Sequence, residues 1–108
     1  MPAKQPDSMQ VVHQPERRRF TILVEGSASG EEPVLEYRLA QDRIAMLHTY
    51  VPEAMEGKGV AAALVTAGLE YARAEGLKVQ PYCPYVAAFI KKHADTWGDI
   101  VAETDVAE

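Results

Sequence analysis

Alternating apolar and polar side chains predict strands in the first half of the chain. Residues 19–25 and 34–40 each place apolar side chains at every second position, the period of a half-buried strand. A shorter run over 11–13 precedes the turn-prone pair Gln14-Pro15 and predicts one more strand. Gln41-Asp42 predicts a tight turn after the second long strand.

The next segment, residues 43–51, is apolar at both odd and even positions. Such a strand is typical of the middle of a sheet that helices cover on both faces. We therefore expect a central strand here, buried on two sides. One face would carry Ile44, Met46 and Tyr50, and the other Ala45, Leu47 and Val51.

After Pro52 the hydrophobic period becomes helical. Apolar residues recur every three or four positions over 60–72, and Gly76 is a favoured residue just beyond a helix C-terminus. Residues 77–82 predict another strand, and Pro84 suits the first turn of a second helix. The order of elements predicts an α/β fold, with a mixed, mostly antiparallel sheet and two main helices.

A length of 108 residues favours one domain. We place it at residues 11–101, with a flexible polar tail over 1–10, a segment that packs back over 97–101 and a frayed acidic end over 102–108.

Composition narrows the function classes. Hydrophobic residues make up 47% and charged residues 25% of the chain, as in globular proteins. No stretch approaches the roughly 20 apolar residues of a membrane helix, so we expect no membrane association. The net charge of -5 disfavours nucleic acid as a partner. The single cysteine, Cys83, has no disulfide partner within the chain, which fits a reducing cytoplasm.

The glycine-rich turn over 56–61 joins the expected central strand to the first long helix. Glycines let the backbone approach a ligand closely, and the first N–H groups of a helix bind anions. The turn therefore predicts a phosphate-bearing ligand, with an ordinary loop as the alternative. Residues 57–62 also fit a dinucleotide fingerprint, which is disfavoured because the next strand ends without an acidic residue. A Walker P-loop does not fit.

The same turn fits the acyl-CoA loop of GNAT N-acetyltransferases, arginine/glutamine-x-x-glycine-x-glycine/alanine, as Glu56-x-x-Gly59-x-Ala61. Glutamate replaces the usual first residue. From about Val11 to Ile100 the chain resembles the small YjdJ-like GNAT family. The similar segments are Arg19-Phe20, Leu35-Glu36-Tyr37, His48-Thr49-Tyr50-Val51-Pro52, Glu56-Gly57-Lys58-Gly59, Leu64-Val65, Ala72-Arg73, Gly76-Leu77-Lys78-Val79, Cys83-Pro84-Tyr85-Val86 and Lys92-His93.

This resemblance implies a reduced GNAT fold, acetyl-CoA as co-substrate and an amine on a small molecule or protein as acceptor. It also implies that backbone amides of the strand before the loop hold the thioester carbonyl. By position these are the amides of Thr49, Tyr50 and Val51. The pyrophosphate would lie on Gly57, Lys58, Gly59, Val60 and Ala61.

Cys83 is a candidate catalytic residue because it precedes Pro84 at an expected helix start, where a thiol is acidified. It could carry the acyl group or protonate the leaving thiolate, and we expect it to be accessible from the cofactor slot. The alternative is a small buried apolar residue. GNAT enzymes often use a tyrosine as general acid, which makes Tyr85 the first candidate and Tyr82 the second.

His48 on the central strand is a candidate general base for the acceptor ammonium, with Glu53 as a second. The alternative for His48 is a core histidine with one hydrogen-bonded ring nitrogen. Lys91, Lys92 and His93 suit the negative end of the second helix, and a contact with the 3′-phosphate of CoA is the alternative role. No residues have metal-ligand spacing.

These features predict a GNAT-type N-acetyltransferase that moves an acetyl group from acetyl-CoA to an amine. An acyl-CoA-binding module with little turnover is the first alternative. A structural protein without a cofactor is the second.

Overall fold

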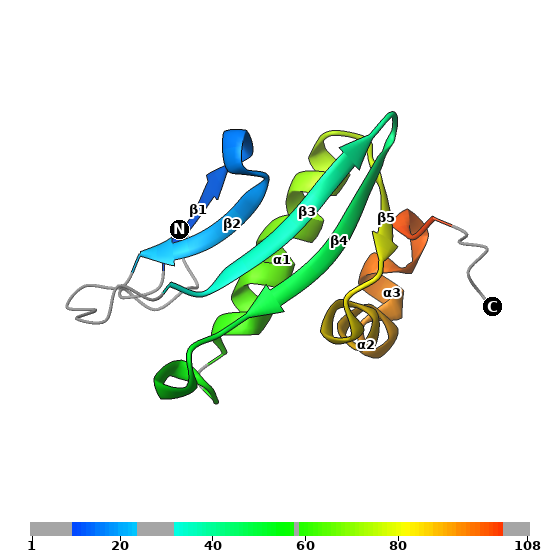
Figure 1. Ribbon diagram of the computed structural model, residues 1–108. Helices are drawn as coiled ribbons and strands as arrows, with labels where there is room; N and C mark the ends of the chain where they lie inside the picture. Colours follow the sequence, from blue (N-terminus) through cyan, green and yellow to red (C-terminus); the bar gives the residue numbers. More distant parts are fainter. Residues whose placement is uncertain (1–9, 24–31, 58, 103–108) are drawn as a thin grey trace, which may run out of the picture.

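The computed structural model describes residues 10–23, 32–57 and 59–102, and its strands form one five-stranded sheet. The strands lie side by side in chain order, as Figure 1 shows. β1 to β4 pair antiparallel, whereas β4 and β5 pair parallel, so the predicted mixed sheet is confirmed. The strands are β1 (Gln10–Gln14), β2 (Arg19–Leu23), β3 (Val34–Ala40), β4 (Arg43–Tyr50) and β5 (Lys78–Pro81).

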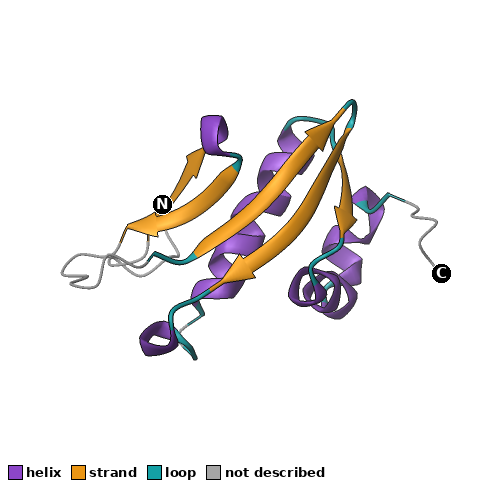
Figure 2. Ribbon diagram, in the orientation of Figure 1, coloured by secondary structure: helices purple, strands orange, loops and turns teal. Residues whose placement is uncertain are grey.

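The helices gather against one face of this sheet. In Figure 2, α1 runs behind β3 and β4, and it also contacts β1, β2 and β5. Within the described residues, none of the helices has the length and apolar character of a membrane-spanning segment. The α-helices are α1 (Val60–Ala74), α2 (Pro84–Lys92) and α3 (Ala94–Trp97), with short 3-10 helices η1 (Pro15–Arg17), η2 (Glu53–Met55) and η3 (Gly98–Ile100).

Glycines in the left-handed region bound α1 at both ends. Gly59 is its N-cap with φ 80°, and Gly76 beyond its C-terminus has φ 71°. At the C-terminus, Leu77 N–H donates to Ala72 O at 2.8 Å and Gly76 N–H to Arg73 O at 3.2 Å. These two bonds form a Schellman motif, which confirms the predicted helix end at Gly76.

A β-bulge in β4 changes which side chains face the helices. Glu36 of β3 pairs with His48 and Tyr37 with Met46, so Leu47 has no direct partner on β3. The extra residue shifts the alternation by one position. Buried Leu35 and Tyr37 of β3 therefore face the same side as Thr49 and Met46, respectively.

The expectation that β4 is buried on both faces was wrong. Ile44 and Met46 are fully buried, but Leu47 on the same strand is 40% exposed. Without a bulge, residues 46 and 51 would face opposite sides of the sheet. Because of the bulge, Val51 packs against the same core as Met46. The other face of the strand stays open to solvent over Ala45, Leu47, His48 and Tyr50, which are partly or largely exposed.

The chain after α3 returns to the sheet. Val101 forms a parallel bridge with Val79 of β5, and Ala102 N–H donates to Val79 O at 2.8 Å. Arg73 of α1 holds this segment, because its guanidinium bonds Asp99 Oδ1 at 2.5 Å and lies 4.8 Å from the centre of the Trp97 ring. The predicted segment that packs back over 97–101 is confirmed.

An aromatic cluster joins β1 to the rest of the sheet. The His13 ring stacks on Phe20 at 4.2 Å between centroids and meets the edge of Tyr71 at 4.5 Å. Its Nε2 forms a hydrogen bond with the Tyr37 hydroxyl at 2.5 Å. Burial lowers the pKa of His13 below its usual value, and the charge of Glu16 opposes this shift only in part. The neutral imidazole is therefore the form that the fold favours.

We expect acid to destabilise the protein through His13. The pKa of His13 is lower in the folded than in the unfolded state. Its contribution to the free energy of unfolding is therefore complete above the ordinary histidine pKa and is lost as the pH falls from there through the lower, folded-state pKa. His13→Phe should flatten the dependence of the urea midpoint between about pH 7.5 and about pH 5. The matched variant His48→Gln changes an exposed histidine on β4 and should keep that dependence. An equally steep slope in His13→Phe would contradict this assignment.

Candidate functional site

The candidate site lies where β4 and β5 separate. Their parallel pairing runs from Arg43↔Lys78 to Met46↔Pro81, and one further bond joins Cys83 N–H to Met46 O at 3.0 Å. Beyond this point the chain after β4 turns into α1, and the chain after β5 turns into α2. The N-termini of both helices therefore open toward the same gap at the carboxyl ends of two parallel strands, where α/β sheets bind ligands.

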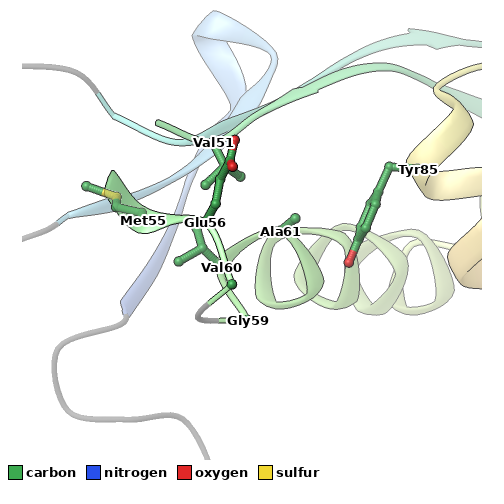
Figure 3. Close-up of a pocket in the computed structure, with 8 residues that line it drawn as sticks. Val51, Met55, Glu56, Gly59, Val60, Ala61 and Tyr85 are labelled. Carbon is green, nitrogen blue, oxygen red and sulfur yellow. The ribbon is translucent and has the colours of Figure 1, made fainter. Parts of the chain in front are cut away.

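A cavity of about 240 Å³ occupies this gap. Figure 3 shows that its walls come from the end of β4, from η2 and the glycine turn, from the first turn of α1 and from α2. The lining is mostly apolar side chains and glycine backbone. It comprises Val51, Met55, Glu56, Gly57, Gly59, Val60, Ala61 and Tyr85.

The turn before α1 leaves backbone N–H groups available to a ligand. The first helical bond runs from Ala63 N–H to Gly59 O, and no side chain caps the helix. The N–H groups of Val60 and Ala61 consequently have no acceptor within the helix. Gly57 and Gly59 have φ of 81° and 80°, and a Cβ at either position would meet no atom within 4 Å. A phosphate group fits this open helix end, where the helix dipole also favours an anion.

Glu56 lines the same cavity, but its charge points away from the helix end. Its side chain is exposed, and Figure 3 shows the carboxylate next to Val51 and away from Gly59. An anion on the first turn of α1 would therefore not contact this carboxylate directly. The electrostatic cost of Glu56 is that of a separated, solvent-screened charge.

The structure brings Thr49 and Cys83 together from two strand ends. The Thr49 hydroxyl and the Cys83 sulfur are 3.3 Å apart, and either can be the donor. Cys83 precedes Pro84 as the N-cap of α2, as predicted, but its thiol does not cap the helix. With only 5% of the residue exposed, the thiol is more buried than we expected for an accessible group.

Tyr85 places a phenol over the cavity. In Figure 3 its side chain extends from α2 toward the first turns of α1, and 41% of the residue is exposed. Burial of part of the ring raises the pKa of Tyr85 above its ordinary value. The hydroxyl is thus protonated at neutral pH and can act as a hydrogen-bond or proton donor.

Thr49, Cys83 and the remaining candidates are not among the residues that line this cavity. His48 is exposed opposite Glu36 on the open sheet face, and Glu53 is exposed at the start of η2. Tyr50 is 41% exposed on β4, and Tyr82 is 53% exposed after β5. Lys58 is outside the described residues, as are the two predicted tails except for Gln10 and Ala102. No group of metal-ligating side chains occurs within the described ranges.

The sequence interpretation missed Met55 and the role of Leu47. Met55 reaches the cavity because η2 folds the chain back between Pro52 and Glu56, where Met55 N–H donates to Pro52 O at 2.8 Å. The prolyl residue and the following Glu-Ala-Met are the available signal for such a turn. No local signal marks the bulge at Leu47, since the partner strand determines it.

Comparisons with known proteins bear on the family and the fold of this chain. A family model described as GCN5-related N-acetyl-transferase matches residues 19–100. The protein named NATD1 from Gallus gallus is 36% identical over 86 residues, covering 79% of this chain and 76% of its own length. NATD1 from Homo sapiens is 35% identical over 86 residues, with 79% and 74% covered. A GCN5-like protein from Staphylococcus aureus, solved by NMR, shares the fold with a TM-score of 0.67 at 21% identity, covering 95% of this chain and 97% of its own.

Proposed function

Because the chain belongs to the GCN5-related N-acetyltransferase family, we propose that it binds acetyl-CoA and transfers the acetyl group to an amine on a small molecule or protein. The observation that carries this proposal is the cavity between the carboxyl end of β4, the uncapped start of α1 and Tyr85. We further assign the chain to the YjdJ-like subgroup and to the cytoplasm. The segment similarities support the subgroup, and the lone, unpaired Cys83 fits a reducing compartment.

The proposed cofactor position follows from the two ends of the site. The N–H groups at the start of α1 suit the pyrophosphate of CoA. Thr49 and Cys83 lie where β5 no longer pairs with β4, so the backbone of β4 from Leu47 onward can offer its amides to a thioester carbonyl. In this arrangement the acyl end of the coenzyme lies beside the Thr49–Cys83 pair. The apolar side chains of Val51 and Val60 flank the part of the coenzyme between the acyl group and the pyrophosphate.

Acetyl transfer in this site requires a neutral amine and a donor for the departing sulfur. The amine nitrogen forms a bond to the thioester carbonyl carbon, the carbon–sulfur bond breaks, and the nitrogen loses a proton. Cys83 or Tyr85 can deliver a proton to the thiolate, because both side chains lie at the N-terminus of α2. His48 or Glu53, both exposed near the end of β4, can accept the ammonium proton from the acceptor.

An acyl-CoA-binding module with little turnover is the second candidate. It is favoured by the open sheet face, on which Leu47, His48 and Tyr50 are exposed to solvent. Such a module would bind the coenzyme as tightly as an enzyme and release no free CoA.

The decisive experiment combines binding and turnover. CoA should raise the melting temperature in a concentration-dependent way, because a ligand of the native state stabilises it by mass action. With acetyl-CoA and a panel of amines, free thiol and acetylated product should appear together. Stabilisation without either product would support the binding module. No stabilisation far above any reasonable dissociation constant would reject both functions.

We expect Glu56→Arg to tighten CoA binding about two- to fivefold at low ionic strength, because a cation replaces an anion that lies near the phosphates without contacting them. The gain should shrink as salt is added. Glu75→Arg makes the same change in net charge at the opposite, C-terminal end of α1 and should not tighten binding. Titration calorimetry at two salt concentrations checks this. Equal effects of the two variants would mean that only net charge matters.

A further inference from the structure

The two borders of the sheet differ in how they are protected. At the β5 border the backbone is engaged, because Val101 forms a bridge with Val79 and Ala102 N–H donates to Val79 O. Pro81, the last residue of β5, has no N–H to offer a further strand. β1 forms the other border (Figure 1), and no described segment pairs with its outer side. Within its described part, each copy of the chain therefore has one open strand edge.

The sequence of β1 lacks the features that usually keep an edge strand from pairing. Such strands often carry charged residues, prolines or bulges that discourage a further strand. β1 reads Gln-Val-Val-His-Gln, with no proline and, while the imidazole is neutral, no charge. All of its residues pair with β2 in one unbroken register. Its backbone is therefore a regular template for another strand.

The core beneath β1 is only partly closed. Val11 faces the helices, because its partner on β2 is the fully buried Ile22. His13 faces them too, opposite buried Phe20. Both side chains of β1 are nevertheless only partly buried, as is Tyr71 of α1, whose ring meets that of His13. Apolar and aromatic surface thus remains in contact with solvent at the open edge, where a second strand would cover it.

β1 is also complementary to a second copy of itself. An antiparallel copy with a two-fold axis at Val12 would place this residue opposite its own equivalent. Val11 would then lie opposite His13 on the helix side of the sheet. On the other side, Gln10 would lie opposite Gln14, and their amide groups can bond to each other. No like charges face one another in this register, and the Val12 side chains pack together.

We infer that the chain forms a two-fold symmetric dimer through β1, in which the two five-stranded sheets join into one continuous sheet. A two-fold axis perpendicular to the sheet keeps the helices of both copies on the same face. Since the Val79–Val101 bridge occupies the other border, association stops at two copies and does not continue as a fibre. The cavity lies at the end of β4, separated from β1 by β2 and β3, so the dimer leaves it open. The inference is independent of the proposed function.

The test measures the mass of the full chain by sedimentation equilibrium at increasing concentration. Because a short strand buries little surface, we expect weak association, with a dissociation constant of roughly 10–100 µM. Val12→Lys should raise this constant about tenfold or more, since it places like charges opposite each other at the two-fold axis. Val34→Lys is the matched control. Val34 lies in the same row of the open sheet face but on the interior strand β3, so this variant should dimerise like the parent.

A charge-swap arm tests the register. Val12→Glu should also weaken association on its own, for the same reason as Val12→Lys. An equimolar mixture of the two variants should form a heterodimer, because opposite charges then meet at the axis, and added salt should weaken it. Melting temperatures of the separate variants show that each remains folded.

Four outcomes would overturn the inference. The parent could stay monomeric up to about 1 mM, well above the expected dissociation constant. Val12→Lys could leave a parent dimer intact, which would place the interface elsewhere. Val12→Lys and Val34→Lys could weaken the dimer alike, which would assign the interface to the open face of the sheet. Folded Val12→Lys and Val12→Glu could remain monomeric when mixed, which would exclude two-fold pairing about this residue.

Discussion

Replacing Cys83 with alanine is expected to lower acetyl transfer about a hundredfold or more, the usual contribution of a positioned acid or nucleophile. The reason is that Cys83 lies where β4 and β5 separate, with its sulfur 3.3 Å from the Thr49 hydroxyl. CoA affinity should change little, because the proposed phosphate contacts lie on α1. Steady-state release of free thiol, with CoA affinity measured separately, checks the result.

Cys83→Ser separates the possible roles of the sulfur. An acyl carrier should give an acetylated protein on mixing with acetyl-CoA alone, visible by mass spectrometry, and the serine variant should lose nearly all turnover. A proton donor should leave no covalent species, and serine, which can keep the bond with Thr49, should retain part of the rate. Unchanged turnover in Cys83→Ala, with reduced stability alone, would identify a packing residue, as its 5% exposure permits.

Gly59→Val is expected to weaken CoA binding roughly a hundredfold, because a branched side chain occupies the approach to the α1 N–H groups. A Cβ here meets no protein atom within 4 Å, so the side chain would fill the space that we assign to the pyrophosphate. The backbone at φ +80° adds strain of about 1–3 kcal/mol to any non-glycine residue.

Gly76→Val is the matched control for that strain. Gly76 has φ +71°, and its Cβ position is equally open, but it lies at the other end of α1. Both variants should lose similar stability in urea, whereas only Gly59→Val should lose CoA. Parallel loss of binding in the two variants would show that helix strain, and not obstruction of the site, is responsible.

Local sequence determined most of the secondary structure because short-range rules govern it. Strict alternation marked β2 and β3, and the helical period marked α1 between two glycines that adopt positive φ. Pro84 marked the start of α2 because its fixed φ and missing N–H suit a first turn. The glycine turn before α1 was likewise visible, since only its residue types and their place between a strand and a helix were needed.

Tertiary structure alone decided how the site is assembled. The bulge at Leu47 depends on the register between β3 and β4, and it returns Val51 to the side that holds Met46. The bulge moves the core-facing side chains from even-numbered to odd-numbered positions. The sequence therefore shows apolar residues at both, which we interpreted as burial on two faces. Thr49 and Cys83 are 34 residues apart, and they meet because α1 crosses between two parallel strands that separate just beyond Met46 and Pro81. Tyr85 faces the α1 turn for the same reason. Alternation and spacing report the local path of the backbone, whereas these contacts depend on pairing and packing between distant segments.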